Sequence, residues 1–194
     1  MNKKRVGVLI SGGGSNMRAL VEASRDASYP AEIVFVGSNR LDAGGLNFAR
    51  QHRISHACID HKNFSTRESF DGAMLAELQK HDLDLICCAG FMRIMTPILI
   101  KPWEGRMLNI HPSLLPLYKG LHTHQRALAD GAKLHGATVH FVSEELDGGP
   151  AIAQACVPVL DHDTAETLSA RVLAIEHPLY VKALALVASG EVYM

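Results

Sequence analysis

The sequence lacks a strong charge of either sign and any long apolar run, and each absence excludes a class of protein. Its 194 residues include 19 Lys and Arg against 20 Asp and Glu, which gives a formal net charge of −1 at pH 7. This balance offers no electrostatic footprint for nucleic acid or for an anionic membrane. No apolar stretch approaches the roughly 18 residues of a membrane span, and the N-terminus has no signal-peptide pattern. We therefore expect a cytoplasmic protein without nucleic-acid or membrane partners.

Paired-cysteine motifs are also absent. The four cysteines lie inside apolar runs without C-x-x-C spacing, at Cys58, Cys87, Cys88 and Cys156. Because Cys87 and Cys88 are adjacent, their side chains point to opposite faces of a strand and are poor disulfide partners. The pattern predicts buried, reduced thiols.

What the sequence does contain is an alternation of strand-like and helix-like segments. A hydrophobic fraction of 47% with 20% charged residues is typical of a globular protein, and the length favours one domain over residues 1–194. Strands are predicted at 5–10, 32–37, 54–59, 83–89 and 107–111, and helices at 17–23, 43–52, from 65, from 96, at 121–128 and from 163. Strands at 137–142 and 152–159 predict a hairpin through the turn at 147–149. We therefore predict a Rossmann-like α/β fold: a mainly parallel twisted sheet, helices on both faces and an antiparallel C-terminal edge.

A glycine-rich turn, Ser11-Gly-Gly-Gly-Ser-Asn16, joins the first predicted strand to the first predicted helix. That order of elements aims backbone N–H groups and a helix N-terminus at an anion. The spacing is not G-x-G-x-x-G, and the Walker lysine is missing, so a single phosphate is favoured over a dinucleotide or a triphosphate. Ser15 or Asn16 would cap the helix or add a donor. A tight turn without a ligand is the alternative.

Two polar side chains stand in the apolar run at 107–116, Met-Leu-Asn-Ile-His-Pro-Ser-Leu-Leu-Pro. Strand alternation places Asn109 and His111 on the same side. An amide and an imidazole that point the same way suit a carbonyl that becomes an oxyanion. Asp147, in the later glycine-rich turn, could return to His111 and hold its tautomer. Each residue alone could be an ordinary turn residue, and only the combination favours catalysis.

Three segments, 12–16, 90–95 and 109–112, lie at or just after the ends of predicted strands. In open α/β sheets, ligands bind at the carboxyl ends of the strands, near a topological switch point. The residues alone thus predict one rim that holds a phosphate cradle and an Asn/His/Asp cluster.

A metal-dependent hydrolase is an alternative, with ligands among His111, His122, His124 and Asp147. The sequence has no H-x-x-x-H or similar spacing. His122 and His124 flank a predicted helix start, where residues two apart diverge. We predict no metal.

Five segments together resemble the phosphoribosylglycinamide formyltransferase family, folate-dependent enzymes of purine biosynthesis. They follow the family's order over nearly the whole chain, at 10–16, 89–94, 108–116, 120–124 and 145–150. The Asn-x-His pair with the later Asp is shared by all relatives that use 10-formyltetrahydrofolate. The Gly-Gly-Gly-Ser-Asn turn and the Gly-Leu-His-Thr-His segment are more specific to this family.

The resemblance implies a formyltransferase fold and a reaction. The amine of glycinamide ribonucleotide would attack the formyl carbon of 10-formyltetrahydrofolate and give a tetrahedral intermediate. Asn109 and protonated His111 would stabilise its oxyanion. Asp147 would keep His111 charged and, through a water, relay the proton from the amine to the leaving nitrogen.

The resemblance also implies binding residues. The ribonucleotide phosphate would lie on Gly14, Ser15 and Asn16, with Glu176 near the amine, so residues 1–100 form a phosphate-binding half and 101–194 a catalytic and folate-binding half. The folate cosubstrate would contact a longer set, consisting of Arg67, Met92, Arg93, Ile94, Met95, Asn109, Ser143, Glu144, Glu145 and Leu146. Taken alone, Met92–Met95 would be ordinary core, Arg67 a solvated charge and Glu176 a surface residue. The partners expected are these two small molecules, and a monomer and a homodimer both stay open.

Three rival functions share features with this reading. Methionyl-tRNA formyltransferase has the same Asn/His/Asp set but needs an RNA-binding domain and a basic surface, which we do not expect here. Formyltetrahydrofolate hydrolase would let water attack in the same site, but has no need of a phosphate loop. A non-catalytic folate- or nucleotide-binding protein would need a defect in the set, and all three residues are present.

Overall fold

The fold is organised around one seven-stranded sheet. The structure, a computed structural model, describes residues 3–194. The strand order is β3-β2-β1-β4-β5-β6-β7, in which β1 to β5 are parallel and β6 and β7 are antiparallel. The strands are β1 (Lys4–Ile10), β2 (Ala31–Ser38), β3 (Ser55–Cys58), β4 (Leu85–Cys88), β5 (Met107–His111), β6 (Leu134–Phe141) and β7 (Ala151–Pro158). The predicted mainly parallel sheet with an antiparallel C-terminal edge is confirmed, as is the hairpin.

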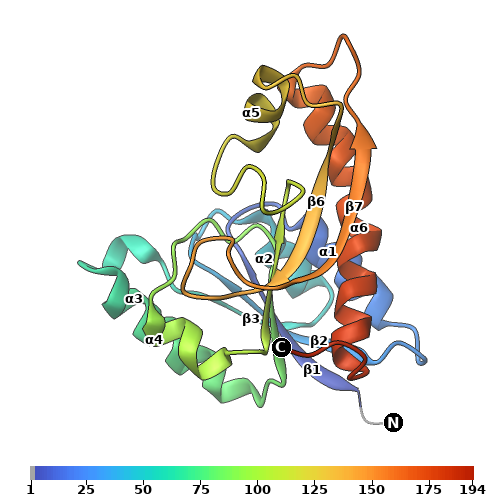
Figure 1. The fold of residues 1–194 in the computed structure, drawn as a ribbon. Helices are drawn as coiled ribbons and strands as arrows, with labels where there is room; N and C mark the ends of the chain where they lie inside the picture. The colour runs from blue at the N-terminus through green and yellow to red at the C-terminus, as the bar shows by residue number, and fades with distance from the viewer. Residues whose placement is uncertain (1–2) are drawn as a thin grey trace.

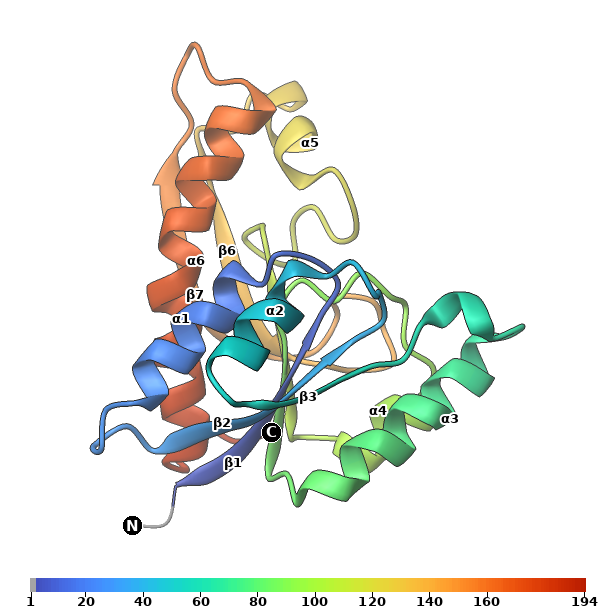
Figure 2. The ribbon, with the colours of Figure 1, turned by 180° about the vertical axis from the view of Figure 1, so that it is seen from behind.

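Helices cover both faces of this sheet (Figures 1 and 2). They are α1 (Ser15–Ser24), α2 (Gly44–Gln51), α3 (Arg67–Leu78), α4 (Pro97–Ile100), α5 (Thr123–Ala129) and α6 (Ala165–Ala188), with short 3₁₀ turns at η1 (His61–Asn63), η2 (Gln79–His81) and η3 (Lys101–Trp103). Within residues 3–194, no helix is both long and apolar enough to cross a membrane.

The sequence spacing predicts N-caps at Ser65, with Glu68, and at Asp163, with Glu166, and both predictions were wrong by one residue. Helix α3 is capped by Thr66 and not by Ser65. The Thr66 hydroxyl accepts a hydrogen bond from the Ser69 N–H. The N-cap of α6 is Thr164, which forms a capping box with Thr167 in place of Asp163 and Glu166. Both sites offer two adjacent capping side chains, so spacing alone cannot select the register.

The sheet separates two hydrophobic cores. The larger core packs α1, α2 and α6 on one face, and the smaller one packs α3, α4 and η3 on the other. Cys87 belongs to the larger core and Cys88 to the smaller, which confirms that the adjacent thiols point to opposite faces. The expectation that all four thiols are buried was wrong for two of them: Cys58 is half-buried, and Cys156 is exposed because alternate residues of the edge strand β7 face solvent.

The topological switch point lies between β1 and β4. From β1 the chain first builds outward to β2 and β3, then returns to add β4 and β5 on the other side. The loops that follow β1 and β4 meet there, since the Ser11 N–H donates to the Gly90 carbonyl at 3.0 Å. This is the edge at which α/β sheets bind ligands.

Candidate active site

A cavity of about 580 Å³ opens beside the carboxyl ends of β4 and β5. Its walls come from the loop after β4, the end of β5, the start of α5 and the loop between β6 and β7. Most of the predicted catalytic and folate residues line it together, namely Met92, Arg93, Ile94, Met95, Asn109, His111, Ser143, Glu144, Glu145, Leu146 and Asp147. The lining does not include Arg67, Gly14, Ser15, Asn16 or Glu176.

Asn109 is oriented by a histidine on the neighbouring strand. The two residues are register partners of β5 and β6, and Asn109 Nδ2 lies 3.2 Å from His140 Nε2. His140 Nδ1 lies 2.8 Å from the Phe141 carbonyl, so Nδ1 holds the proton and Nε2 accepts from the amide. Burial lowers the pKa of His140, which keeps the ring neutral and this pattern intact. One amide N–H of Asn109 thus points at His140, and the second is available to a ligand.

His111 is buried, with both ring nitrogens facing acceptors. Nε2 lies 2.9 Å from the Tyr118 carbonyl, and Nδ1 lies 3.4 Å from Asp147 Oδ2. Since a carbonyl can only accept, Nε2 donates to Tyr118, and the Nδ1 contact with Asp147 is an ion pair only when Nδ1 also carries a proton. The longer contact, to Asp147, is the one that a substrate group or a water can replace.

Asp147 reaches the site from the loop between β6 and β7. Its Oδ2 accepts from the Gly120 N–H at 2.9 Å, and its Oδ1 lies 3.7 Å from His140 Nε2. Asp147 has a φ of 50°, a left-handed conformation that Asp tolerates better than most residues. The loop also passes so close to β6 that a Cβ on Gly149 would lie 1.9 Å from the Phe141 carbonyl oxygen. The backbone path therefore sets where this carboxylate sits.

The glycine turn forms the second part of the rim. Gly14 is the N-cap of α1, with a φ of 71°, so the predicted capping by Ser15 or Asn16 was wrong: both lie inside the helix. The first intrahelical bond runs from Arg18 N–H to the Gly14 carbonyl at 2.9 Å. The preceding N–H groups, of Ser15, Asn16 and Met17, have no acceptor within the helix. N–H groups in this position at the start of a helix are the kind of donors to which proteins bind anions.

Glu176 on α6 is tied to this turn. Its Oε2 accepts from Asn16 Nδ2 at 2.6 Å, and Glu176 is only 8% exposed, so it is not the surface residue that its sequence context suggested. Burial raises the pKa of Glu176, and the bond from Asn16 acts in the opposite direction. Asn16 Oδ1 is buried without a partner.

Sequence reasoning missed the supporting residues on β6. His140 orients Asn109, and Thr138 holds the loop after β5, because its hydroxyl donates to the Ser113 carbonyl at 2.7 Å and accepts from the Leu115 N–H at 3.0 Å. The sequence signal that could have revealed them is the pair of polar residues Thr138 and His140, two positions apart in an otherwise apolar strand.

Two more histidines stand beside the cavity. His124 Nδ1 lies 3.1 Å from His135 Nε2, and burial together with the neighbouring His124 lowers the pKa of His135 to about 4. In the part of the chain that the structure describes, no group of three His, Cys, Asp or Glu side chains is arranged to hold a metal ion.

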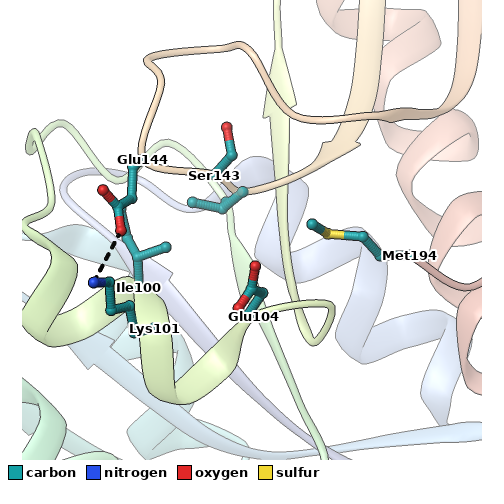
Figure 3. Close-up of a pocket in the computed structure, with 7 residues that line it drawn as sticks. Ile100, Lys101, Glu104, Ser143, Glu144 and Met194 are labelled. Atoms are coloured by element: carbon teal, nitrogen blue, oxygen red, sulfur yellow. Dashed lines mark ion pairs between the residues drawn. The ribbon is translucent and has the colours of Figure 1, made fainter.

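A second, smaller cavity of about 230 Å³ is lined by the loop that follows β6, by residues 100–104 and by Met194 (Figure 3). Ser143 and Glu144 line both cavities, and Lys101 on η3 forms an ion pair with Glu144 at 3.6 Å. Both partners are largely exposed, so this pair adds little stability.

Comparison with known proteins assigns the chain to a family. The formyl transferase family model matches residues 4–184. The chain is 44% identical over 187 residues to phosphoribosylglycinamide formyltransferase of Escherichia coli, covering 96% of this chain and 88% of that protein. The crystal structure of phosphoribosylglycinamide formyltransferase from Brucella melitensis is 54% identical, with a TM-score of 0.92 and 98% of each chain covered.

Larger relatives contain a similar segment. A trifunctional purine biosynthetic protein, adenosine-3, of Chironomus tentans is 50% identical over 192 residues, which are 98% of this chain and 14% of that protein. The human protein of the same name is 46% identical, and the chain spans 19% of its length.

Proposed function

The chain belongs to the formyl transferase family, and from that premise we propose that it transfers a formyl group from 10-formyltetrahydrofolate to the amine of glycinamide ribonucleotide, a step of purine biosynthesis. The observation that supports this best is the convergence of Asn109, His111 and Asp147 from β5 and a distant loop on one cavity. Asp147 lies far along the chain from Asn109 and His111, and only the fold brings it beside them.

The folate cosubstrate occupies the main cavity. Met92, Ile94 and Leu146 line the cavity yet are 70%, 53% and 53% exposed. Apolar side chains with only a few polar groups among them suit a flat heterocycle such as a pterin. Met92–Met95, called the folate segment below, forms one wall. Arg67, at the start of α3 and exposed, is proposed to contact the outer end of the cosubstrate.

Formyl transfer proceeds by nucleophilic addition and elimination. The amine nitrogen forms a bond to the formyl carbon, and the carbonyl electron pair moves onto oxygen. The second amide N–H of Asn109 donates to that oxyanion, and the charge of protonated His111 stabilises it further. When the intermediate collapses, the bond to the folate nitrogen breaks.

Proton transfer falls to Asp147 and His111. The amine loses a proton as it attacks, and the departing folate nitrogen gains one. Asp147 lies beside Nδ1 of His111, across the longer of the ring's two contacts. A water bound beside this pair would connect the amine to the leaving nitrogen, with the Asp147 carboxylate as its hydrogen-bond acceptor.

The ribonucleotide binds across the rim. Its phosphate lies on the N-terminus of α1 at Gly14, Ser15 and Asn16, where backbone N–H groups have no helical acceptor. Its amine end passes Glu176, which is fixed by Asn16. This arrangement points the amine towards β5 and the formyl carbon.

The test is a spectrophotometric assay of tetrahydrofolate release from 10-formyltetrahydrofolate, run with and without glycinamide ribonucleotide. Turnover that requires the ribonucleotide is the expected result. Equal turnover without it would mean that water is the acceptor, and the proposal would fall.

A further inference from the structure

The folate segment is held from behind at two points. The Met92 N–H donates to the Ser11 hydroxyl at 2.7 Å, and the N–H of Thr96, the residue after the segment, donates to Asp71 Oδ2 at 2.5 Å. In both cases a side chain from another element takes a backbone donor that the segment cannot satisfy by itself. Ser11 directly follows β1, and Asp71 lies on α3.

Ser11 is oriented for this contact. It is 6% exposed, and its hydroxyl donates to Asn39 Oδ1 at 2.6 Å. With its proton committed to Asn39, the hydroxyl turns a lone pair towards Met92. Asn39 itself is 2% exposed at the end of β2, so the anchor is fixed to the sheet.

Asp71 is the more unusual of the two. It is 1% exposed, its Oδ1 has no partner, and no Lys, Arg or His nitrogen among residues 3–194 lies within salt-bridge distance of it. A buried carboxylate with one hydrogen bond is unfavourable for stability, and a neutral residue would cost less. The preceding residue, Phe70, packs its ring under the Arg93 guanidinium at 5.0 Å. One turn of α3 thus holds both the side chain and the backbone of this stretch.

We propose that Asp71 and Ser11 are positioning residues for the folate cosubstrate, each fixing one end of the folate segment. The inference rests on the proposed function. Met92 and Ile94 are largely exposed, so little packing holds their side chains in place. A wall fixed before binding costs less to order when the cosubstrate arrives, so the anchors act on affinity and leave the chemical step unchanged.

The experiment compares Asp71→Ala, Asp71→Asn and Ser11→Ala in steady-state assays with each substrate varied. We expect Asp71→Ala to raise the KM for 10-formyltetrahydrofolate about tenfold, as loss of a hydrogen bond to a charged group would. The KM for the ribonucleotide and kcat should stay within about twofold. Ser11→Ala should show the same pattern with a smaller shift, because its anchor is uncharged. Calorimetric titration with tetrahydrofolate should reproduce both losses.

Asp71→Asn supplies the conservative rescue. An amide oxygen can still accept the Thr96 N–H, so the KM should return close to that of the unmodified protein while the melting temperature rises. If Asp71→Asn matches Asp71→Ala, the hydrogen-bond role is contradicted.

Leu78→Ala is the matched control for stability. Leu78 is fully buried on the same helix, about two turns beyond Asp71. It should lower the melting temperature without changing either KM, and an equal KM shift in this variant would overturn the inference. An inactive unmodified protein would contradict the proposed function instead, whereas an active one with unchanged KM in both anchor variants would contradict only the anchoring.

Discussion

The two parts of the proposed site present different kinds of group to a ligand. At the glycine turn, the groups available to a ligand are mostly backbone N–H groups at the start of α1. In the cavity, they are side chains of Asn109, His111 and Asp147, each oriented by a hydrogen-bonding neighbour. The difference teaches where residue identity matters: in the cavity it determines the chemistry, whereas at the turn it matters only where it sets the backbone path.

The strongest test of the side-chain half is Asp147→Asn. Removing the negative charge leaves the Gly120 N–H with an acceptor but ends charge support and proton transfer at His111. We expect kcat to fall about 10²–10⁴-fold, the usual contribution of acid–base catalysis. Circular dichroism should show an unchanged fold, and a loss below about threefold would show that the carboxylate is dispensable.

Asn109→Ala should have the next largest effect. Losing one oxyanion donor typically costs about 10²–10³ in kcat. Because the amide acts mainly on the intermediate, KM for both substrates should change little, which pre-steady-state and steady-state kinetics can separate. A variant with normal kcat and a raised KM would place Asn109 in binding and not in catalysis.

Gly14→Ala should sharpen the contrast at the backbone half. A Cβ there would lie 2.7 Å from Met17 Cε, on a residue with a φ of 71°. The strained turn should raise the KM for the ribonucleotide about tenfold and destabilise the protein by about 1–2 kcal/mol. The matched variant Ser15→Ala keeps its N–H and should shift KM by less than about threefold. Equal effects in the two variants would mean that side chains bind the phosphate.

Glu176→Gln should give the smallest change. Burial raises the folded-state pKa of Glu176 above its ordinary 4.5, so the folded protein holds this proton to higher pH than the unfolded chain does. The stability that protonated Glu176 contributes is complete below the pKa that this side chain has in the unfolded chain. It is lost as pH rises through the pKa of Glu176 in the folded protein. Gln removes that loss, so the melting temperature should rise at about pH 8 and change less at about pH 4. A variant less stable at both pH values would contradict this assignment.

The sheet and the cavity could be predicted because their signals are local. Buried strands, the glycine turn and the spacing of Asn109 and His111 are each visible in a few consecutive residues. The rule that parallel strands present their carboxyl ends at one edge then brings the loops after β1, β4 and β5 together. Asp147 followed only because its turn lies in a hairpin that returns to β5.

The supporting contacts could not be predicted because they depend on register between distant strands. Asn109 faces His140 only because β5 and β6 pair antiparallel in one particular register, and a shift of one residue would remove the contact. Likewise, Glu176 and Asn16 are 160 residues apart, and their bond depends on how α6 crosses α1. The predicted caps of α3 and α6 were wrong for a simpler reason, since two adjacent side chains at each helix start can both act as a cap.

The adjacent thiols of β4 make the two faces of the sheet separately observable. Burial raises the pKa of Cys87 to about 12 and also raises that of Cys88, so neither offers much reactive thiolate in the folded state. Cys87 is closed in by α1, α2 and α6, and Cys88 by α3 and α4. In a background without Cys58 and Cys156, single-thiol variants would therefore report, by their alkylation rates, how often each layer of helices lifts from the same strand. The two thiols of one strand would thus report separately on the helices beside the glycine turn and on the helices that support the folate segment.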